Sequence, residues 1–201
     1  MLTIFGDSQS GNCYKVQLLM HHLDIEHVWV HVNILAGETR APEFLAKNPN
    51  GKIPLLQLAA GSYLAESNAI LNYLAEGTSY LPKDRLKRAQ VLGWQFFEQY
   101  SHEPYIAVAR FIAKYLGLPE ERRKDFEAKQ SGGNQALAVM ERHLCHHPWF
   151  VGDAMTIADI SLYAYTHVAH EGGFDLSKYP SINSWIKRIG EHPRHMKMLS
   201  R

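Results

Sequence analysis

The spacing of hydrophobic residues predicts strands only in the first part of the chain. The apolar run 2–5 predicts a strand that ends at Gly6-Asp7. In the segment 28–33, the three valines alternate with Trp29, His31 and Asn33, which predicts a half-buried strand. The run 55–58, the turn at Ala60-Gly61 and the pair Tyr63-Leu64 predict a hairpin.

Helical periodicity fills the gaps between these strands. Hydrophobic residues recur at helical spacing from Val16 to Leu23, and Pro42 opens a short helical segment that runs through Lys47. Ser67 is predicted to be the N-cap of a third helix, whose apolar residues are Ala69, Ile70, Leu71 and Leu74. The resulting order, β-α-β-α-β-β-α, is typical of a thioredoxin-like domain, whose ligand end lies where the first helix begins.

Beyond a linker around Pro82, the pattern predicts helices alone. A long helical pattern covers 85–115, and Pro104 is expected to bend or break it. A second tract covers 119–147, in which Gly132-Gly133 predicts either a kink or close helix packing. The predicted fold is therefore α+β with two domains: a thioredoxin-like domain (1–77), a linker (78–86) and an all-α helical-bundle domain (87–201).

Local signals place two further helix starts in the second domain. Thr156 is predicted to be an N-cap with Asp159 in the capping-box position three residues later. Pro180 stands at a first-turn position before Ile182 and Trp185. Thr156 and Asp159 are therefore interpreted as folding signals and not as catalytic residues.

Composition excludes several classes of function. Lys+Arg 21 against Asp+Glu 20 leaves no basic excess, so nucleic acid is not an expected partner. No leader-like segment follows Met1 and no apolar run is long enough to span a bilayer, so no membrane partner is expected. Two cysteines, Cys13 and Cys145, are too few for a disulfide framework and fit the reducing cytoplasm. The 12 histidines form i, i+3 pairs such as His143 and His146, but no third ligand accompanies them, so no metal is expected.

Two chemical signals lie about a dozen residues apart. Asn50-Gly51-Lys52-Ile53-Pro54 delivers a proline into an apolar run, and a cis Ile53-Pro54 bond would turn the amide and carbonyl of Ile53 toward an extended peptide. Farther on, Glu66 can hold an ammonium group, and the helix start at Ser67 offers donors to a carboxylate. Together these groups match the γ-glutamyl-cysteinyl part of glutathione.

The motifs N-P-x-G-x-I-P and E-S-x-A-I-x-x-Y-L, at 48–54 and 66–74, resemble those of the cytosolic glutathione transferases. The resemblance covers essentially the whole chain and favours a bacterial, serine-type, theta- or phi-like member. It implies glutathione as co-substrate, a cytoplasmic detoxification role and a glutathione site formed by Arg40, Lys52, Ile53, Pro54, Glu66 and Ser67.

The start of the first helix carries the candidate catalytic residues. These enzymes use the glutathione thiolate, and lowering a thiol pKa from about 8.5 by about two units takes roughly 2.7 kcal/mol. Ser10 through Val16 resembles the S-x-x-C-x-K/R-V pattern of the serine-type classes, so we assign the catalytic role to Ser10 and Asn12 together. Ser10 has an alternative role as a plain N-cap. The tyrosine-type position falls near Phe5-Gly6, and the first position of C-x-x-C is Ser10, so neither the tyrosine nor the cysteine mechanism fits.

The resemblance also implies a site for a small hydrophobic electrophile against the helical domain. Its candidate residues are Tyr14, Tyr105, Ile106, Ala109 and Arg110. The alternative places Tyr105 and Ile106 in the core and Arg110 on the surface. The printed sequence stops soon after Met198-Leu199, so we expect no long C-terminal helix over this site and hence an open one.

Three functions remain open at this stage. The first is a glutathione transferase that transfers glutathione to alkyl or aryl electrophiles. The second is a glutathione-dependent disulfide reductase, peroxidase or isomerase, and the third is a non-enzymatic partner-binding protein of the same fold. The resemblance implies a homodimer in which the Ser67–Glu76 helix packs against the region Trp94–Tyr100 of the partner. Gln99, His102 and Glu103 would then lie near the glutathione of the partner and could help hold its γ-glutamyl ammonium group. The alternative places the aromatic residues of that region in the core.

Overall fold

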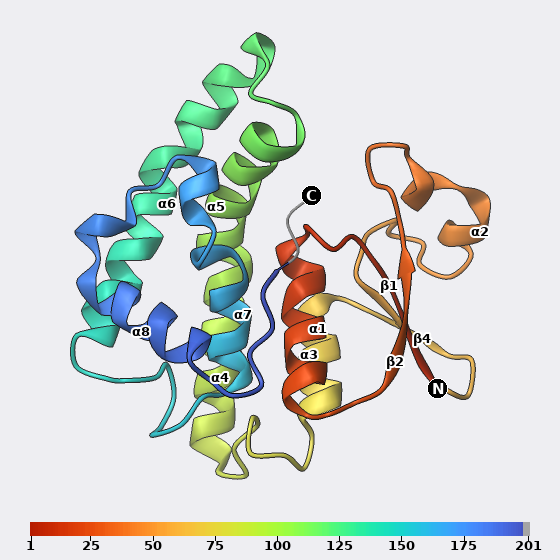
Figure 1. Cartoon of the computed structure of the whole chain (residues 1–201), viewed down its shortest axis with the longest axis horizontal. Helices are drawn as coiled ribbons and strands as arrows, with labels where there is room; N and C mark the ends of the chain where they lie inside the picture. The colour runs from red at the N-terminus through yellow and green to blue at the C-terminus, as the bar shows by residue number, and fades with distance from the viewer. Residues whose placement is uncertain (199–201) are drawn as a thin grey trace. The chain divides into compact units, whose positions relative to one another are not determined.

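The computed structural model describes residues 1–198 and divides the chain into two compact units. One comprises Met1–Glu76 with the segment 193–198, and the other is Gly77–His192 (Figure 1). The first is a thioredoxin-like domain and the second is all-helical, which confirms the predicted fold class. The return of 193–198 to the first unit has no signal in the sequence.

The first unit is built on a four-stranded sheet within the described residues, in the order β2-β1-β3-β4. Strand β1 pairs parallel with β2 and antiparallel with β3, and β3 pairs antiparallel with β4. In chain order its elements are β1 (Leu2–Gly6), α1 (Gly11–His22), β2 (His27–His31), the 3-10 turn η1 (Glu38–Arg40), α2 (Pro42–Leu45), β3 (Leu55–Gln57), β4 (Tyr63–Ala65) and α3 (Ser67–Ala75).

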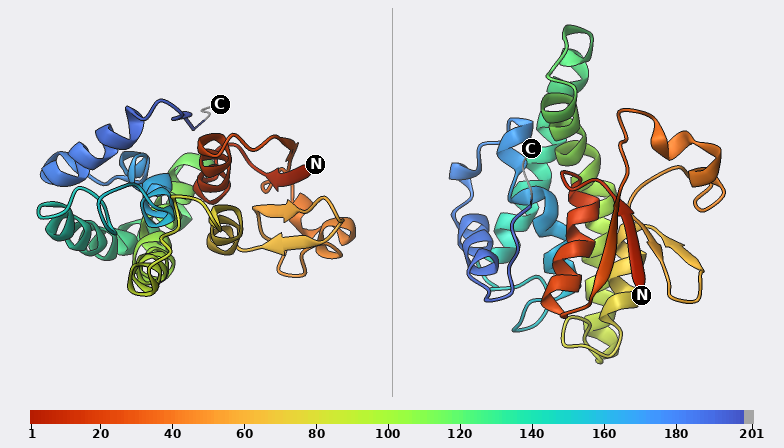
Figure 2. Two further views of the ribbon diagram at one scale, coloured as in Figure 1. Left: turned by 90° about the horizontal axis from the view of Figure 1, so that it is seen from below. Right: turned by 45° about the vertical axis from the view of Figure 1, so that its right-hand side comes forward.

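Helices α1 and α3 pack against each other on one face of this sheet, while α2 lies on the opposite side (Figures 1 and 2). On the α2 side, Val32, Phe44 and Leu55 form a small buried cluster. The predicted half-buried strand is present as β2, in which Val28 and Val30 are 43% and 36% exposed, whereas Trp29 is half-buried. Trp29 pairs with the fully buried Ile4, and a Cβ on Gly6 would lie 2.9 Å from both the Trp29 ring and Cys13 Sγ, so the aromatic ring lies on the α1 side of the sheet.

A nearly continuous helical column opens the second unit. It consists of α4 (Arg85–Phe97), the π-helical segment η2 (Glu98–His102), α5 (Glu103–Arg110) and a second π-helical segment, η3 (Phe111–Tyr115). Pro104 lies in the first turn of α5, where its missing N–H is tolerated. The regular α-helix expected over 85–115 is interrupted directly before Pro104, by the wider turn of the π-helical segment η2.

The remaining helices of this unit are α6 (Arg123–Leu144), α7 (Ile157–Thr166) and α8 (Pro180–Gly190), with 3-10 turns η4 (Glu120–Arg122), η5 (Ala169–Gly172) and η6 (Leu176–Lys178). At the start of α7, Thr156 and Asp159 form the predicted capping box. Asp159 is fully buried and also accepts from Phe150 N–H and Trp185 Nε1–H, both at 3.1 Å. Pro180 lies in the first turn of α8, as predicted.

Helix α6 runs through Gly132 and Gly133 without a break. A Cβ on Gly132 would lie 2.3 Å from the ring of Tyr105, and one on Gly133 would lie 2.2 Å from the ring of Phe174. Of the two predicted outcomes, the structure therefore realises close packing, because only glycine leaves room for these rings.

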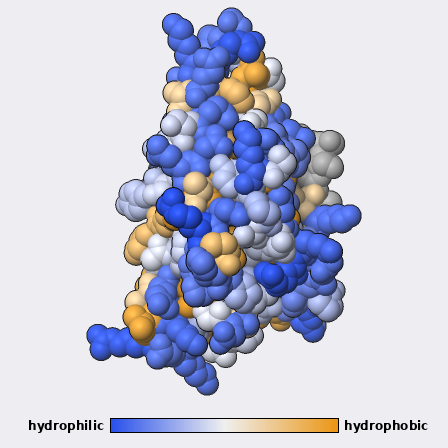
Figure 3. All heavy atoms as spheres, turned by 90° about the vertical axis from the view of Figure 1, so that its left-hand side faces the viewer, coloured by the Kyte–Doolittle hydropathy of each residue, from blue (hydrophilic) through white to orange (hydrophobic). Residues whose placement is uncertain are grey.

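The surface drawn in Figure 3 is mostly hydrophilic, with hydrophobic side chains in small separate groups. Within residues 1–198, no helix combines the length and the apolar character that a membrane span requires. The expectation that no long C-terminal helix covers the electrophile site refers to the chain after Met198-Leu199. Leu199 lies outside the described residues, so this expectation stays a prediction.

Candidate active site

Ser10 caps α1 at its N-terminus. Its backbone is extended, and its Oγ accepts a hydrogen bond from Cys13 N–H at 3.4 Å. The cap interpretation of Ser10 is thus realised, but it does not exclude a catalytic role. A serine hydroxyl that accepts one hydrogen bond still has its proton to donate, and the half-buried Ser10 can be reached from solvent.

Asn12 connects the start of α1 with the start of α3. Its Oδ1 accepts a hydrogen bond from the hydroxyl of Ser67 at 3.3 Å, across 55 residues of sequence. This contact brings the predicted thiolate donors and the predicted carboxylate cradle into one site.

The thiol of Cys13 lies behind this site and is fully buried. Burial raises its pKa to about 12, although the hydrogen bond with Ser10 opposes the shift. A Cβ on Gly6 would lie 2.9 Å from both Cys13 Sγ and the ring of Trp29, so α1 sits tightly on the sheet here. Cys13 is therefore a packed residue and not a nucleophile.

The peptide bond between Ile53 and Pro54 is cis, as predicted. The next residue, Leu55, pairs with Ala65 in β4, so Pro54 lies beside Glu66 across the hairpin. Pro54 is buried and Ile53 is half-buried. The loop before the proline is held by Asn48, whose Nδ2 donates to the Lys52 carbonyl at 2.8 Å.

Glu66, and not Ser67, is the N-cap of α3, so this part of the prediction is wrong. Glu66 has φ 69° and ψ 111°, an unusual backbone for a residue with a side chain, and α3 begins at Ser67 itself. Such strain is concentrated at binding and catalytic sites. As a consequence the carboxylate of Glu66 is exposed, while Ser67 is only 6% exposed and turns its hydroxyl to Asn12.

Arg40 lies close to Gly51 in space, and Lys52 follows Gly51 in the chain. A Cβ on Gly51 would come within 2.8 Å of the Arg40 guanidinium, and the positive φ of Gly51, 60°, also favours glycine. Both cationic side chains are exposed. Across residues 1–198, neither they nor Glu66 takes part in an ion pair, which leaves their charges available to a ligand.

The residues predicted for the electrophile are less accessible. Tyr14 is 1% exposed and its hydroxyl donates to the Met196 carbonyl at 2.7 Å. Ile106 and Ala109 are fully buried. Tyr105 is half-buried, with Lys129 Nζ 5.8 Å from its ring centre.

Arg110 is an internal residue of the helical unit. Its side chain is 4% exposed, and its Nε lies 2.6 Å from Glu171 Oε2. Glu171 is half-buried and also binds Lys114 at 3.1 Å. Burial would raise the pKa of Glu171, but the two cations outweigh it and lower the pKa. Arg110 is therefore not on the surface and acts as one partner of an ion pair between α5 and η5.

Sequence reasoning missed Asn48 and the segment 193–198. Asn48 is 5% exposed, and its Oδ1 also accepts from Asn50 N–H at 3.2 Å, so it shapes the loop that leads to the cis proline. The first letter of the N-P-x-G pattern is its only signal. The segment is tied to α1 by Tyr14 and by Arg194, which donates to the His22 carbonyl at 3.1 Å. Within residues 1–198, no three His, Cys, Asp or Glu side chains gather as a metal site.

Comparisons with known proteins agree with this geometry. The family described as "Glutathione S-transferase, N-terminal domain" matches residues 9–76, and "Glutathione S-transferase, C-terminal domain" matches residues 94–193. The crystal structure of a glutathione S-transferase from Pseudomonas fluorescens is 57% identical, covers 99% of each chain and has a TM-score of 0.97.

Two further relatives carry information on chemistry. The disulfide-bond oxidoreductase YfcG of Escherichia coli is 29% identical over 90% of this chain and 87% of its own. The glutathione transferase URE2P6 from Phanerochaete chrysosporium, solved in complex with oxidized glutathione, is 25% identical, with a TM-score of 0.86 over 96% of this chain and 92% of that chain. Both family regions are matched, and the Pseudomonas fluorescens relative is 57% identical over 99% of each chain, so the chain belongs to the cytosolic glutathione transferase superfamily.

Proposed function

We propose that this protein is a glutathione transferase that activates glutathione as a thiolate for attack on small hydrophobic electrophiles. The observation that carries the proposal is the hydrogen bond between Asn12 and Ser67. It places a helix N-terminus with two polar side chains next to a second helix N-terminus, beside a cis proline and an exposed carboxylate. Each of these groups has a partner in glutathione.

In the proposed complex, the thiolate accepts hydrogen bonds from the Ser10 hydroxyl and the Asn12 NH2 group. Hydrogen bonds to a charged group contribute about 1.5–3 kcal/mol each. Either one supplies much of the roughly 2.7 kcal/mol that a two-unit fall in thiol pKa requires. The N-terminus of α1 adds its positive dipole end.

The γ-glutamyl end of glutathione is proposed to lie at the start of α3. Glu66 holds the ammonium group, while the carboxylate accepts from the backbone amide of Ser67 and lies at the N-terminus of α3. The cysteinyl backbone pairs with the amide and carbonyl of Ile53, which the cis Pro54 bond orients. The glycine carboxylate lies between Arg40 and Lys52, whose exposed charges fit it.

The electrophile is proposed to contact the helical unit at the face of α5 that carries Tyr105, the one candidate there that keeps an exposed side within residues 1–198. Its buried neighbours Ile106 and Ala109 would then shape that face from behind. We also propose a cytoplasmic homodimer. Both cysteines are free, as the reducing cytoplasm allows.

A second candidate function is glutathione-dependent disulfide reduction. The relative YfcG is a disulfide-bond oxidoreductase, and the polar turn Ser10-Gly11-Asn12 suits an incoming second thiol. Turnover of a chloronitrobenzene and of hydroxyethyl disulfide, measured side by side with glutathione, separates the two reactions. A strong preference for the disulfide would replace the transferase proposal with this one.

Calorimetry of glutathione binding tests the site directly. Glu66→Gln is expected to weaken binding about tenfold, which corresponds to about 1.4 kcal/mol for the lost ammonium contact. The matched control is Glu43→Gln, an exposed carboxylate on α2 of the same unit, which is expected to bind as the wild type does. A folded wild-type protein that binds no glutathione at millimolar concentration would instead favour a non-enzymatic role.

A further inference from the structure

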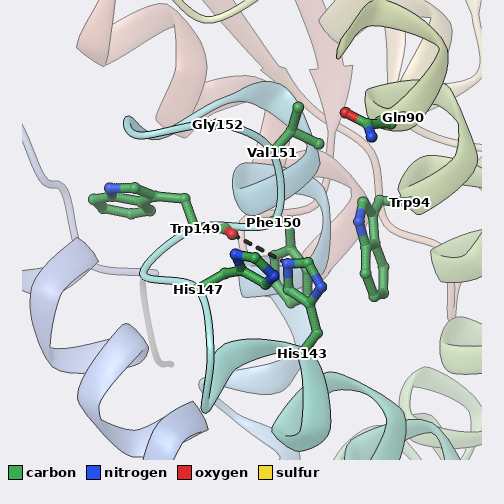
Figure 4. Close-up of a pocket in the computed structure, with 8 residues that line it drawn as sticks. All are labelled: Gln90, Trp94, His143, His147, Trp149, Phe150, Val151 and Gly152. Atoms are coloured by element: carbon green, nitrogen blue, oxygen red, sulfur yellow. Dashed lines mark hydrogen bonds between the residues drawn. The ribbon is translucent and has the colours of Figure 1, made fainter. Parts of the chain in front are cut away.

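The helical unit contains a second pocket that the proposed catalysis does not use. It has a volume of about 210 Å³ and is lined by Gln90 and Trp94 of α4, His143 and His147 at the end of α6, and the segment 149–152 (Figure 4). All of these residues lie within Gly77–His192, so the pocket is complete in that unit alone.

Aromatic rings form much of its wall. The rings of His147 and His143 stack with centroids 4.7 Å apart, and His143 stacks on Phe150 at 5.4 Å with an interplanar angle of 10°. Trp94 meets His143 edge-on at 4.9 Å. Figure 4 shows Trp94 on one side of this stack and Trp149 on the other. An aromatic ring of a ligand could therefore pack against the faces and the edges of these side chains.

Most polar side chains in and around the pocket are hydrogen-bond donors or carry a positive charge. His143 Nε2 donates to the Trp149 carbonyl at 3.2 Å, so the proton of its neutral ring is on Nε2. Burial lowers the pKa of His143, and the neighbouring His147 lowers it further, while the carbonyls of Trp149 and Phe150 oppose the shift. His147 is exposed at the mouth, and within residues 1–198 its ring makes no hydrogen bond.

The elements around the pocket carry both cationic and acidic side chains. Lys87 of α4 lies beside the pocket: its Nζ would be 3.6 Å from a Cβ on Gly152. From α8, the Arg188 guanidinium lies 5.3 Å from the Trp149 ring centre. On the acidic side, Glu141 of α6 accepts from the amides of Ser181 and Ile182, and Asp153 is exposed in the loop after Gly152.

We propose that this pocket binds a single-ring aromatic carboxylate, with the ring between the aromatic walls and the carboxylate at His147 and Lys87. The size fits, because a cavity of about 150 Å³ holds benzene and this pocket has about 210 Å³. The ring N–H of His147 and the ammonium group of Lys87 can both donate hydrogen bonds to a carboxylate, and the ammonium adds an opposite charge.

Benzoate titrations followed by tryptophan fluorescence test the proposal, since Trp94 and Trp149 line the pocket. For so small a ligand, a Kd on the order of 1 mM is expected for benzoate. Benzamide, the neutral analogue, is expected to bind at least about fivefold more weakly, because it carries no negative charge for Lys87. Equal binding of benzoate and benzamide would overturn the carboxylate assignment.

Variants locate the site. His147→Ala is expected to weaken benzoate binding, whereas His146→Ala, at an exposed neighbour that does not line the pocket, is expected to leave it unchanged. Gln90→Phe adds bulk at the exposed mouth and is expected to weaken benzoate binding at least about tenfold. Ser10→Ala is expected to bind benzoate as the wild type does, so the result is independent of the glutathione site. Benzoate binding that Ser10→Ala weakens and Gln90→Phe leaves intact would place the ligand elsewhere and refute the proposal.

Discussion

The side chains of Ser10 and Asn12 both accept hydrogen bonds within the protein, and these contacts bear on what the two residues can offer a ligand. Ser10 uses an oxygen lone pair for Cys13 N–H and keeps its proton. Asn12 accepts with its oxygen from Ser67, and its NH2 group is the part of the side chain that can donate. Both side chains thus contain the donor groups that a thiolate requires.

Cys13 provides a first prediction at this scale. Because burial raises its pKa to about 12, it is expected to resist iodoacetamide at about pH 8, where an ordinary thiol of pKa about 8.5 reacts. Cys145 is exposed and serves as the internal control. Mass spectrometry of the native protein should show one label, on Cys145. Rapid labelling of Cys13 in the folded protein would contradict this account.

Sequence could predict the groups whose geometry is local. The cis bond at Pro54 and the capping box at Thr156 depend on a few adjacent residues. By contrast, Arg110 is buried by Glu171, 61 residues away, and the Tyr14 hydroxyl is held by Met196, 182 residues away. No local pattern carries those partners, so the burial of Tyr14 and Arg110 could not be read from the sequence, whereas helical periodicity allowed the core position of Ile106 as an alternative.

At the scale of elements, close contacts made by glycines position the helices. Gly6 lets α1 approach β1, and Gly133 lets Phe174 lie against α6. The periodicity of a helix predicts which face is buried, but it does not reveal whether a glycine pair bends the helix or admits a ring. The same limit applies to β2, where alternation alone does not say which face carries the helices.

Gly133→Ala provides a prediction for α6. A Cβ there would lie 2.2 Å from the Phe174 ring, so the substitution is expected to destabilise the protein by about 1–3 kcal/mol, despite the better helix propensity of alanine. Urea unfolding measures the change. The control is Gly190→Ala at the end of α8, where a Cβ meets open space and stability is expected to change little. A stabilised Gly133→Ala protein would show that Phe174 moves aside without cost.

At the scale of the whole molecule, an exposed aromatic surface on the helical unit supports the proposed homodimer. Phe96 and Tyr100 are 61% and 77% exposed, whereas Phe97 packs edge-on against Trp94 at 5.3 Å. His102, expected near the glutathione of the partner, is instead fully buried and bonded to Thr166 Oγ1 at 2.9 Å, so that expectation is wrong. Gln99 and Glu103 bond to each other at 2.5 Å and stay half-buried.

Phe96→Glu tests the dimer. A charge placed in an apolar interface is costly, so this variant is expected to sediment as a monomer at micromolar concentration, while the wild type sediments as a dimer. Leu35→Glu is the control, since Leu35 is also exposed, at 59%, but lies in the first unit, in the segment between β2 and η1. A wild-type species at 22.9 kDa, the mass of one chain, would refute the proposed homodimer.

The central claim, that Ser10 and Asn12 hold glutathione as a thiolate, is tested most directly by the thiolate absorbance of the bound glutathione as a function of pH. In the wild type, the thiol is expected to titrate about two units below its usual pKa of about 8.5. Ser10→Ala and Asn12→Ala are each expected to return it by about one unit or more toward that value, because each removes one donor. A bound thiol whose pKa is the same in both variants and the wild type would contradict the account.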